Sequence, residues 1–424
     1  MRIKLRTFLS IYFMLFYLTA CGGGNSSPPD TSIPKDPPTA ERILFKGTGE
    51  LGIFDPSIVE DPGSGRIWMS YSSVDTSMFY VSTLYWTVSL RLAYSDDNGV
   101  NWQDAGVIVA PKVETLVGPM KENHPTGSIP ADSQGIWQNE TSSIIYDPSA
   151  PVAERWKLIW HQYLNANLTS YFADHGWIAM KMASTPLGLA TATPVKLFGG
   201  AGLQADGSNT GSPVFSPIGG MPVIQLNADL SRSIEAADLA ELNLCIFAEP
   251  ALYANKSAVY LTIYCADASS IPTSGKVTEY VVHFRCSNPC TMTSASNWEY
   301  LGRLLTPADA LASTGDHYYQ APALVEKNGK AYLIVSPVNN ALSDERYSGC
   351  RVYEFTDINS NQLRRINGEL VEVARVDGDA NIHNGACGAY SGLDGGIVFS
   401  QLGAIETRGT ADMFKIYKGQ VSLP

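Results

Sequence analysis

Beyond residue 40, the chain alternates short apolar runs with breaks formed by Gly, Pro, Asn and Asp. Most runs are about five to eight residues long and are rich in Val, Ile, Tyr, Trp and Leu, which is typical of β-strands. We find no long apolar segment with the period of an amphipathic helix. The pattern therefore predicts an all-β fold over residues 41–424.

One unit recurs along this part of the chain. It consists of a polar residue, a short apolar strand, a turn and a second strand rich in aromatic residues. The copies begin at Asp55, Glu140, Glu249, Gln320 and Asn384, with spacings of 85, 109, 71 and 64 residues. Each spacing leaves room for a four-stranded sheet that must pack radially against its neighbours. The repeat predicts a five-bladed β-propeller with these polar residues around one mouth of its channel; a pair of β-sandwiches is the alternative.

Residues 95–102 (SDDNGVNW) match the Asp-box pattern S-x-D-x-G-x-x-W. We expect a hairpin turn in which the side chain of Asp97 caps backbone N–H groups, Gly99 takes the strained position and Trp102 packs beneath. The motif supports a propeller and gives Asp97 a structural role.

The N-terminus has the pattern of an export signal. Arg2, Lys4 and Arg6 precede an uncharged apolar run at 8–18 that is too short to span a membrane comfortably. Residues 18–21 (LTAC) resemble the lipobox of bacterial lipoproteins, which implies cleavage before Cys21 and lipidation of its thiol; an ordinary signal peptide with a chance Cys is the alternative. We expect a signal peptide at 1–20, a lipidated and flexible linker at 21–40, and one domain at 41–424.

The expected location is the cell envelope, with the lipid holding the protein on a membrane. The net charge is −12, and it becomes −15 once the three cations of residues 1–20 are removed. This charge argues against nucleic acid and anionic lipid as partners and favours a neutral ligand. We expect a monomer.

Six cysteines remain when Cys21 is set aside, an even number that predicts three disulfides in an oxidising compartment. Cys245 and Cys265 lie ten residues on either side of Asn255 and should face each other across a hairpin. A Cys-rich metal site is the alternative, but it lacks paired CxxC spacing. The remaining pairs are then Cys286 with Cys290, which could close a tight loop, and Cys350 with Cys387.

Three of the repeat openings carry the residues of a known catalytic pattern. Asp55-Pro56-Ser57, Glu140 and Glu249-Pro250-Ala251, together with residues 183–188 (ASTPLG), resemble the five-bladed glycoside hydrolases of the arabinanase and β-xylosidase type, family 43. The resemblance extends over nearly all of the chain beyond residue 45. It implies that Asp55 is the general base and Glu249 the general acid. Glu140 would tune and orient the acid, although the family usually has Asp at that place.

Such a pair fits the chemistry of glycoside hydrolysis. One protonated carboxyl assists the leaving oxygen and one carboxylate activates water, at a separation of roughly 6.5 to 9.5 Å in inverting enzymes. The implied activity is inverting hydrolysis of a neutral oligo- or polysaccharide. The structural alternatives are a turn-capping role for Asp55 and an exposed loop position for Glu140.

Other polar and aromatic residues near the repeat openings are candidates for contacting sugar. For Tyr319 and its neighbour Tyr318, core packing is the alternative. His383 is a candidate for holding a calcium ion or water in the channel, as the resemblance implies, and no cofactor is required. The candidate substrate-binding residues are Trp137, Gln138, Tyr319, Gln320 and Asn384.

Two other functions compete with glycoside hydrolysis. The chain has no HExxH, P-loop or GxSxG motif. The Asp box suggests a sialidase-type propeller, which would need an arginine cluster for its anionic substrate. A non-catalytic propeller that binds glycan or protein is the second alternative, and it predicts scattered carboxylates that share no pocket.

Overall fold

The computed structural model describes residues 40–424 except 47, 81–82, 116–119, 122–127, 130–133, 167–169, 200–236, 238–241, 243–244, 268–277, 295–296, 340–345, 379–382, 390–394 and 403–409. Cys21, the signal peptide and the linker lie outside the described residues. None of the helices within these ranges is long and apolar enough to cross a membrane. Strands dominate, as the sequence pattern predicts, and the helix α5 (Pro307–Thr314) lies between β16 and β17.

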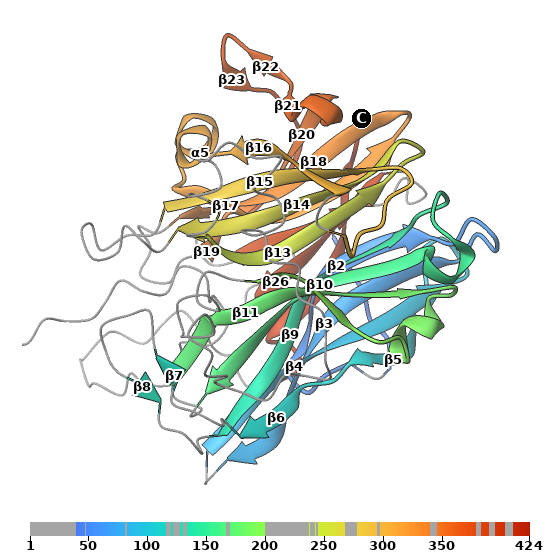
Figure 1. Ribbon diagram of the computed structural model, residues 1–424, viewed down its shortest axis with the longest axis vertical. Coiled ribbons are helices and arrows are strands. Elements are labelled where there is room, and N and C mark those ends of the chain that lie inside the picture. The colour runs from blue at the N-terminus through green and yellow to red at the C-terminus, as the bar shows by residue number, and fades with distance from the viewer. Residues whose placement is uncertain are drawn as a thin grey trace, which may run out of the picture.

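Most of the described strands lie in five antiparallel groups, which we call meanders and number in chain order (Figure 1). The first and the fifth belong to one eight-stranded sheet, because β27 also pairs with β2 in parallel. The first contains β2 (Gly52–Glu60), β3 (Ile67–Tyr80), β4 (Thr83–Ser95) and β5 (Gln103–Val109). The second contains β9 (Gln134–Tyr146), β10 (Trp156–Ala166), β11 (Ser170–Ala183) and β12 (Val195–Gly199), and β6 (Lys112–Thr115) also pairs with β9. The third contains β13 (Cys245–Ala254), β14 (Ala258–Asp267), β15 (Thr278–Ser287) and β16 (Trp298–Leu305).

The last two meanders include strands that are not consecutive in the chain. The fourth contains β17 (Tyr318–Lys327), β18 (Lys330–Asn339), β20 (Gly349–Asp357) and β24 (Glu372–Asp377), and β19 (Arg346–Tyr347) also pairs with β18. The fifth contains β25 (His383–Ala389), β26 (Gly396–Leu402), β27 (Phe414–Ser422) and β1 (Glu41–Arg42). Because β1 pairs with β27, a strand from the start of the described chain completes a sheet formed near its end.

The first strands of the meanders form a ring. β2 contacts β9, β9 contacts β13, β13 contacts β17, β17 contacts β25, and β25 contacts β2. The other strands of each meander follow its first strand in sheet order. The arrangement is propeller-like, in agreement with the repeat.

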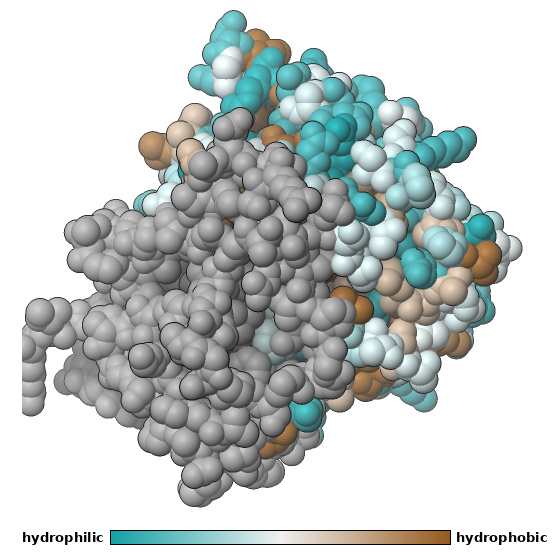
Figure 2. All heavy atoms as spheres, in the orientation of Figure 1, coloured by the Kyte–Doolittle hydropathy of each residue, from teal (hydrophilic) through white to brown (hydrophobic). Residues whose placement is uncertain are grey.

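Apolar clusters fill the spaces between successive meanders. Leu90 and Leu92 of the first meander pack with Trp160 and Trp177 of the second. Further clusters join the second to the third, the third to the fourth, the fourth to the fifth and the fifth to the first. Burial of each large apolar side chain contributes about 1.5 to 3 kcal/mol, so these interfaces hold the ring together. The exposed apolar residues are scattered over the described surface (Figure 2).

The three predicted disulfides are present. They join Cys245 to Cys265, Cys286 to Cys290, and Cys350 to Cys387. The predicted symmetry about Asn255 was wrong in detail, because the hairpin pairs Ala254 with Val259 and a bulge lies further along β13. Cys245 therefore faces Asp267, and its bridge to Cys265 crosses the hairpin diagonally, with Cα atoms 5.1 Å apart.

The Asp box forms the predicted turn between β4 and β5. Asp97 Oδ1 accepts the backbone N–H of Asn101 at 2.8 Å. Hydrogen bonds to the Asp97 carboxylate lower its pKa to about 2. Gly99 has φ 79°, and Trp102 is buried and donates its indole N–H to the carbonyl of Gly99. Asp97 is thus a structural residue.

Candidate functional site

The ring of first strands carries a recurring backbone feature. Each first strand has one non-glycine residue in the left-handed region, at the point where its register with the second strand shifts. A bulge of this kind inserts one residue and redirects the side chain. The five residues are Asp55, Thr141, Glu249, Ala321 and Ala386, with φ of 54°, 52°, 52°, 48° and 44°.

The five bulge residues differ in part from the five residues that the repeat predicted for the ring. Asp55 and Glu249 occupy equivalent places, as predicted. Glu140 and Gln320 each precede their bulge residue by one position, and Asn384 precedes Ala386 by two. None of the five predicted residues is the first of its strand, because β2, β9, β13, β17 and β25 all start upstream of them.

Most bulge residues donate their backbone N–H to a side chain of the preceding meander. The N–H of Thr141 donates to Asp55 Oδ2 at 3.3 Å, and that of Ala321 donates to Glu249 Oε2 at 2.6 Å. Elsewhere serine takes the acceptor's place: Ala386 N–H donates to Ser336 at 2.9 Å, and Asp55 N–H to Ser400 at 2.8 Å. The two carboxylates therefore link meanders, in addition to any chemical role.

Asp55 is buried within β2, where its second hydrogen-bond donor is the hydroxyl of Ser72 at 3.2 Å. Burial raises the pKa of Asp55 well above its ordinary value, and the nearby charges of Glu140 and Glu249 raise it further. The hydrogen bonds from Ser72 and Thr141 oppose this effect because they favour the ionised form.

Glu249 lies within β13 and keeps part of its surface open to the cavity described below. Burial raises the pKa of Glu249 to about 7, against the hydrogen bonds from the Ala321 N–H and the Tyr347 hydroxyl. Tyr347 Oη donates to Glu249 Oε1 at 3.2 Å. Each oxygen of this carboxyl thus accepts one hydrogen bond.

Glu140 completes a group of three carboxyls. It lies in β9 opposite His161 of β10, and it is partly buried. Burial lowers the pKa of His161 to about 3, so this imidazole is neutral and supplies no compensating charge. The charges of Glu140 and Glu249 both raise the pKa of Asp55, and Glu140 also acts on the pKa of Tyr347, so Asp55 lies within electrostatic reach of the other two acids.

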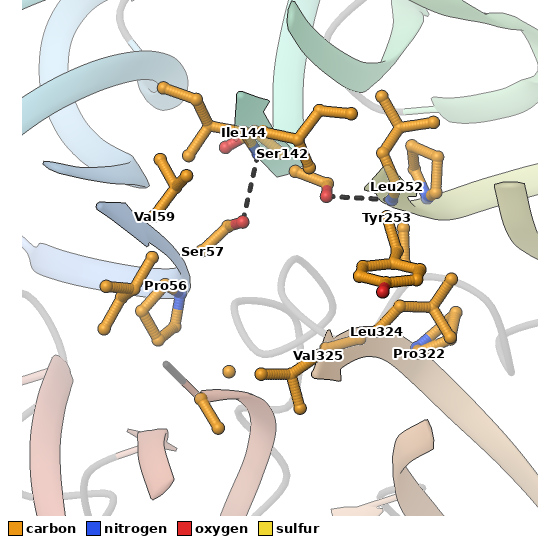
Figure 3. Close-up of a pocket in the computed structure, with 18 of the residues that line it drawn as sticks. Pro56, Ser57, Val59, Ser142, Ile144, Leu252, Tyr253, Pro322, Leu324 and Val325 are labelled. Atoms are coloured by element: carbon orange, nitrogen blue, oxygen red, sulfur yellow. Dashed lines mark hydrogen bonds between the residues drawn. The ribbon is translucent and has the colours of Figure 1, made fainter. Parts of the chain in front are cut away.

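A cavity of about 550 Å³ extends through the ring from the bulge residues. Asp55 and Glu249 line it, as do Glu60 and Glu326. Many of the other lining side chains are apolar (Figure 3). The hydroxyls of Ser57 and Ser143 accept backbone N–H groups of the next meander, at 3.0 and 2.9 Å. The apolar side chains labelled in Figure 3 are Pro56, Val59, Ile144, Leu252, Pro322, Leu324 and Val325.

The structure places several predicted sugar-binding residues in packing positions instead. Trp137 is buried between the first and second meanders, with its ring 4.4 Å from that of Trp177. Tyr319 is buried between the third and fourth meanders, and its hydroxyl lies 2.6 Å from that of Tyr353. Tyr318 is also in an apolar cluster. Their aromatic faces are used in the core, which for Tyr318 and Tyr319 is the alternative noted from the sequence.

The three predicted polar residues also make structural contacts. Gln138 is buried and accepts the backbone N–H of Val88 at 2.8 Å, which links the second meander to the first. Asn384 donates to the carbonyl of Asp377 and accepts from Gln401. Gln320 is buried beside the bulge of β17. These contacts do not present the three side chains as a sugar-binding surface.

His383 is the first residue of β25 and is buried. Within the described part of the chain, no group of three or more His, Cys, Asp or Glu side chains is arranged to hold a metal ion. Calcium in the channel stays a prediction.

Sequence reasoning missed Tyr347, which belongs to no repeat unit. It also missed the serines that accept bulge N–H groups. A signal for these was present, because Ser72, Ser336 and Ser400 occupy corresponding positions in the second strands of three repeats. Nothing in the sequence around Tyr347 indicates a contact with Glu249.

No protein-family model matches the chain, and no curated protein sequence matches it. Solved structures that resemble it are glycoside hydrolases. A thermostable family-43 glycoside hydrolase is 13% identical, with a TM-score of 0.43 over 89% of this chain and 95% of the other. An α-L-arabinofuranosidase from Podospora anserina is 10% identical, with a TM-score of 0.42 over 91% and 98%. A family-43 endo-arabinanase from Bacillus licheniformis is 12% identical, with a TM-score of 0.41 over 88% and 95%. These similarities are remote, and the function has to be argued from the site.

Proposed function

We propose that this protein is a lipid-anchored, five-bladed β-propeller of the cell envelope that hydrolyses glycosidic bonds in a neutral glycan. The observation that carries the proposal is the pair of buried carboxyls, Asp55 and Glu249. They lie at equivalent bulges of the ring, line one cavity and both have raised pKa values. Two carboxyls of this kind are what acid–base hydrolysis of a glycoside requires.

In the proposed mechanism, Glu249 donates a proton to the leaving oxygen and Asp55 activates water. Water then attacks from the opposite face of the sugar, which inverts the anomeric centre. Glu249 is suited to the acid role because its raised pKa retains the proton near neutral pH. The base role needs ionised Asp55, and the Ser72 hydroxyl and the Thr141 N–H, which both donate to its oxygen Oδ2, favour that form against the burial that raises its pKa.

The two carboxyls titrate as a pair. Each has a raised pKa, and the charge of Glu249 raises the pKa of Asp55. Such groups lose their protons in two macroscopic steps, and the productive state is the one that holds a single proton between them. We therefore expect a bell-shaped dependence of kcat/KM on pH.

A glycan- or protein-binding propeller without activity is the second candidate. Asp55 and Glu249 each accept a bulge N–H group, and serine makes the same contact in another meander. The two carboxylates could therefore serve the fold alone, which favours this candidate. A sialidase-type function has less support, because no arginine is among the described residues that line the cavity.

The test is a hydrolysis screen of neutral oligo- and polysaccharides with the soluble fragment 41–424. We expect wild-type activity on at least one glycan and a loss of about 100-fold or more in Asp55→Asn and in Glu249→Gln. Glu299→Gln, an exposed glutamate paired with Arg285, serves as the matched control and should keep full activity. Binding of a glycan without hydrolysis in all variants would favour the binding propeller.

A further inference from the structure

Tyr347 is held in a defined place between three meanders. It lies in β19, opposite Val338 at the end of β18. Its ring packs beside the apolar cluster that contains Ala248 and Tyr318. On another side the ring lies against Gly385 of β25, where a Cβ atom would come within 2.2 to 2.5 Å of it. Only glycine at position 385 leaves room for the ring.

The hydroxyl of Tyr347 is directed at the carboxyl group of Glu249, to which it donates at 3.2 Å. The other oxygen of Glu249 is already bound by the N–H of Ala321. The two donors approach different oxygens, so together they fix the orientation of the carboxyl. The charges of Asp55, Glu140 and Glu249 all act on this hydroxyl and, with burial, raise the pKa of Tyr347. It therefore remains a donor throughout the neutral range.

We propose that Tyr347, seated against Gly385, is a positioning residue that orients Glu249 and stabilises its carboxylate when the proton leaves. The inference rests on the proposed function and deepens it. As Glu249 gives its proton to the leaving oxygen, negative charge develops on the carboxyl. A donor already in place meets that charge without reorganisation, so its hydrogen bond is stronger in the transition state than before.

The neighbouring charges determine the sign of the expected pH effect. Among the described titratable groups, Tyr347 and Asp55 on β2 interact with Glu249; Glu140 on β9 acts on both of these, while His161 on β10 is neutral. Tyr347 favours the ionised form of Glu249 and so lowers its pKa. Its removal should raise that pKa, and activity that depends on protonated Glu249 should then persist to higher pH.

The experiment compares Tyr347→Phe with Tyr353→Phe, which removes another largely buried hydroxyl that contacts Tyr319 and not the three acids. We expect Tyr347→Phe to lower kcat about tenfold, with a smaller change in KM, and to move the alkaline limb of the pH profile up by about one unit. Tyr353→Phe should leave the profile unchanged. Gly385→Ala should reproduce the effects of Tyr347→Phe, because it displaces the ring while keeping the hydroxyl.

A second measurement separates this inference from the proposed function. Carbon-13 NMR titration of labelled glutamate reports the pKa of Glu249 without any substrate, with Glu249→Gln used to assign its signal. A higher pKa in Tyr347→Phe than in wild type supports the contact even if no glycan is hydrolysed. An unchanged pKa and an unchanged pH profile in the folded variant would overturn the inference.

Discussion

The first and third meanders have the same backbone turn as the fourth and fifth, but a different side chain on it. Asp55 and Glu249 have φ of 54° and 52°, and Ala321 and Ala386 have φ of 48° and 44°. A left-handed conformation is unfavourable for each of these residues, and it recurs around the ring. The strained backbone conformation is therefore a feature of the fold. The side chain at the bulge determines which meanders present an acid there.

Serines and acids also share one structural task on these turns. Ser336 and Ser400 accept bulge N–H groups, as do Asp55 and Glu249. The acids differ because burial raises the pKa of each. An acceptor for the N–H explains the need for an oxygen atom, but it does not require a carboxyl that retains a proton near neutral pH. The serine variants below test the acceptor role, and the Glu140 variant tests the proton-retaining role.

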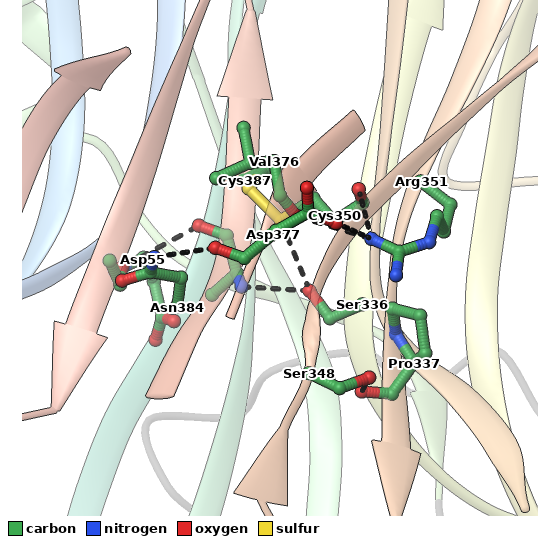
Figure 4. The surroundings of a disulfide bond; sticks show 12 residues. Asp55, Ser336, Pro337, Ser348, Cys350, Arg351, Val376, Asp377, Asn384 and Cys387 are labelled. Carbon is green, nitrogen blue, oxygen red and sulfur yellow. Dashed lines mark hydrogen bonds and ion pairs between the residues drawn. A yellow bond between two sulfur atoms is a disulfide. The ribbon is translucent and has the colours of Figure 1, made fainter. Parts of the chain in front are cut away.

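The largest expected effect on stability comes from the disulfide that joins the fourth and fifth meanders. Figure 4 shows Cys350 and Cys387 beside Ser336. Replacing both cysteines by Ser should lower the free energy of unfolding by about 4 kcal/mol, because their bridge closes a span of 37 residues. The same change at Cys286 and Cys290, which are four residues apart, should cost about 2 kcal/mol. Urea denaturation measures both; equal losses would contradict this account of the two bridges.

A smaller effect is expected when a serine acceptor is removed. Ser336→Ala should lower the free energy of unfolding by about 1 to 3 kcal/mol, because the buried N–H of Ala386 loses its acceptor. Ser72→Ala should cost less, since Asp55 still accepts the N–H of Thr141. Thermal unfolding of both variants tests the order. A greater loss in Ser72→Ala would show that Asp55 does not replace the hydroxyl.

Glu140→Gln should change the pH dependence of hydrolysis with little effect on stability. The charge of Glu140 raises the pKa of Asp55, so its removal lowers that pKa and lets Asp55 ionise at lower pH. We expect the acid limb of the kcat/KM profile to move down by about half a unit to one unit. A profile identical to that of wild type would show that Glu140 has no influence on the pair.

The smallest effect is expected at a bulge that carries no acid. Ala386→Gly relieves the cost of the left-handed conformation but increases the freedom of the unfolded chain. The two contributions oppose each other, and the free energy of unfolding should change by less than about 1 kcal/mol. Hydrolysis should be unchanged. A large loss of activity would mean that the backbone of the fifth meander, and not only the acids, takes part in the site.

The sequence contained enough information to predict the strand-rich fold, the repeat and the three cysteine pairs. The period of the apolar runs and the hairpin around Asn255 are local features, which can be recognised from a single sequence. The acids Asp55 and Glu249 were also found, because each precedes a proline at the same place in its repeat. Both residues occupy the bulge position of their first strand.

The sequence did not predict features that depend on register or on distant contacts. An extra residue in a strand moves a side chain to the other face, and this shift put Thr141 and not Glu140 at the second bulge. An aromatic side chain suits a channel mouth and a core equally well, so the sequence alone does not show that Trp137 and Tyr319 pack in the core. Tyr347 reaches Glu249 over 98 residues of sequence, so only the fold brings the two together.

The most direct test of the acid–base pair measures how the activity of each variant depends on the leaving group of the substrate. The substrates are the glycan found in the screen and the dinitrophenyl glycoside of the same sugar, whose leaving group needs little protonation. Glu249→Gln should lose at least about 100-fold on the glycan but retain most of the wild-type kcat on the dinitrophenyl glycoside, whereas Asp55→Asn should lose activity on both. The reverse pattern would exchange the two roles. Wild-type rates in both folded variants would contradict the account.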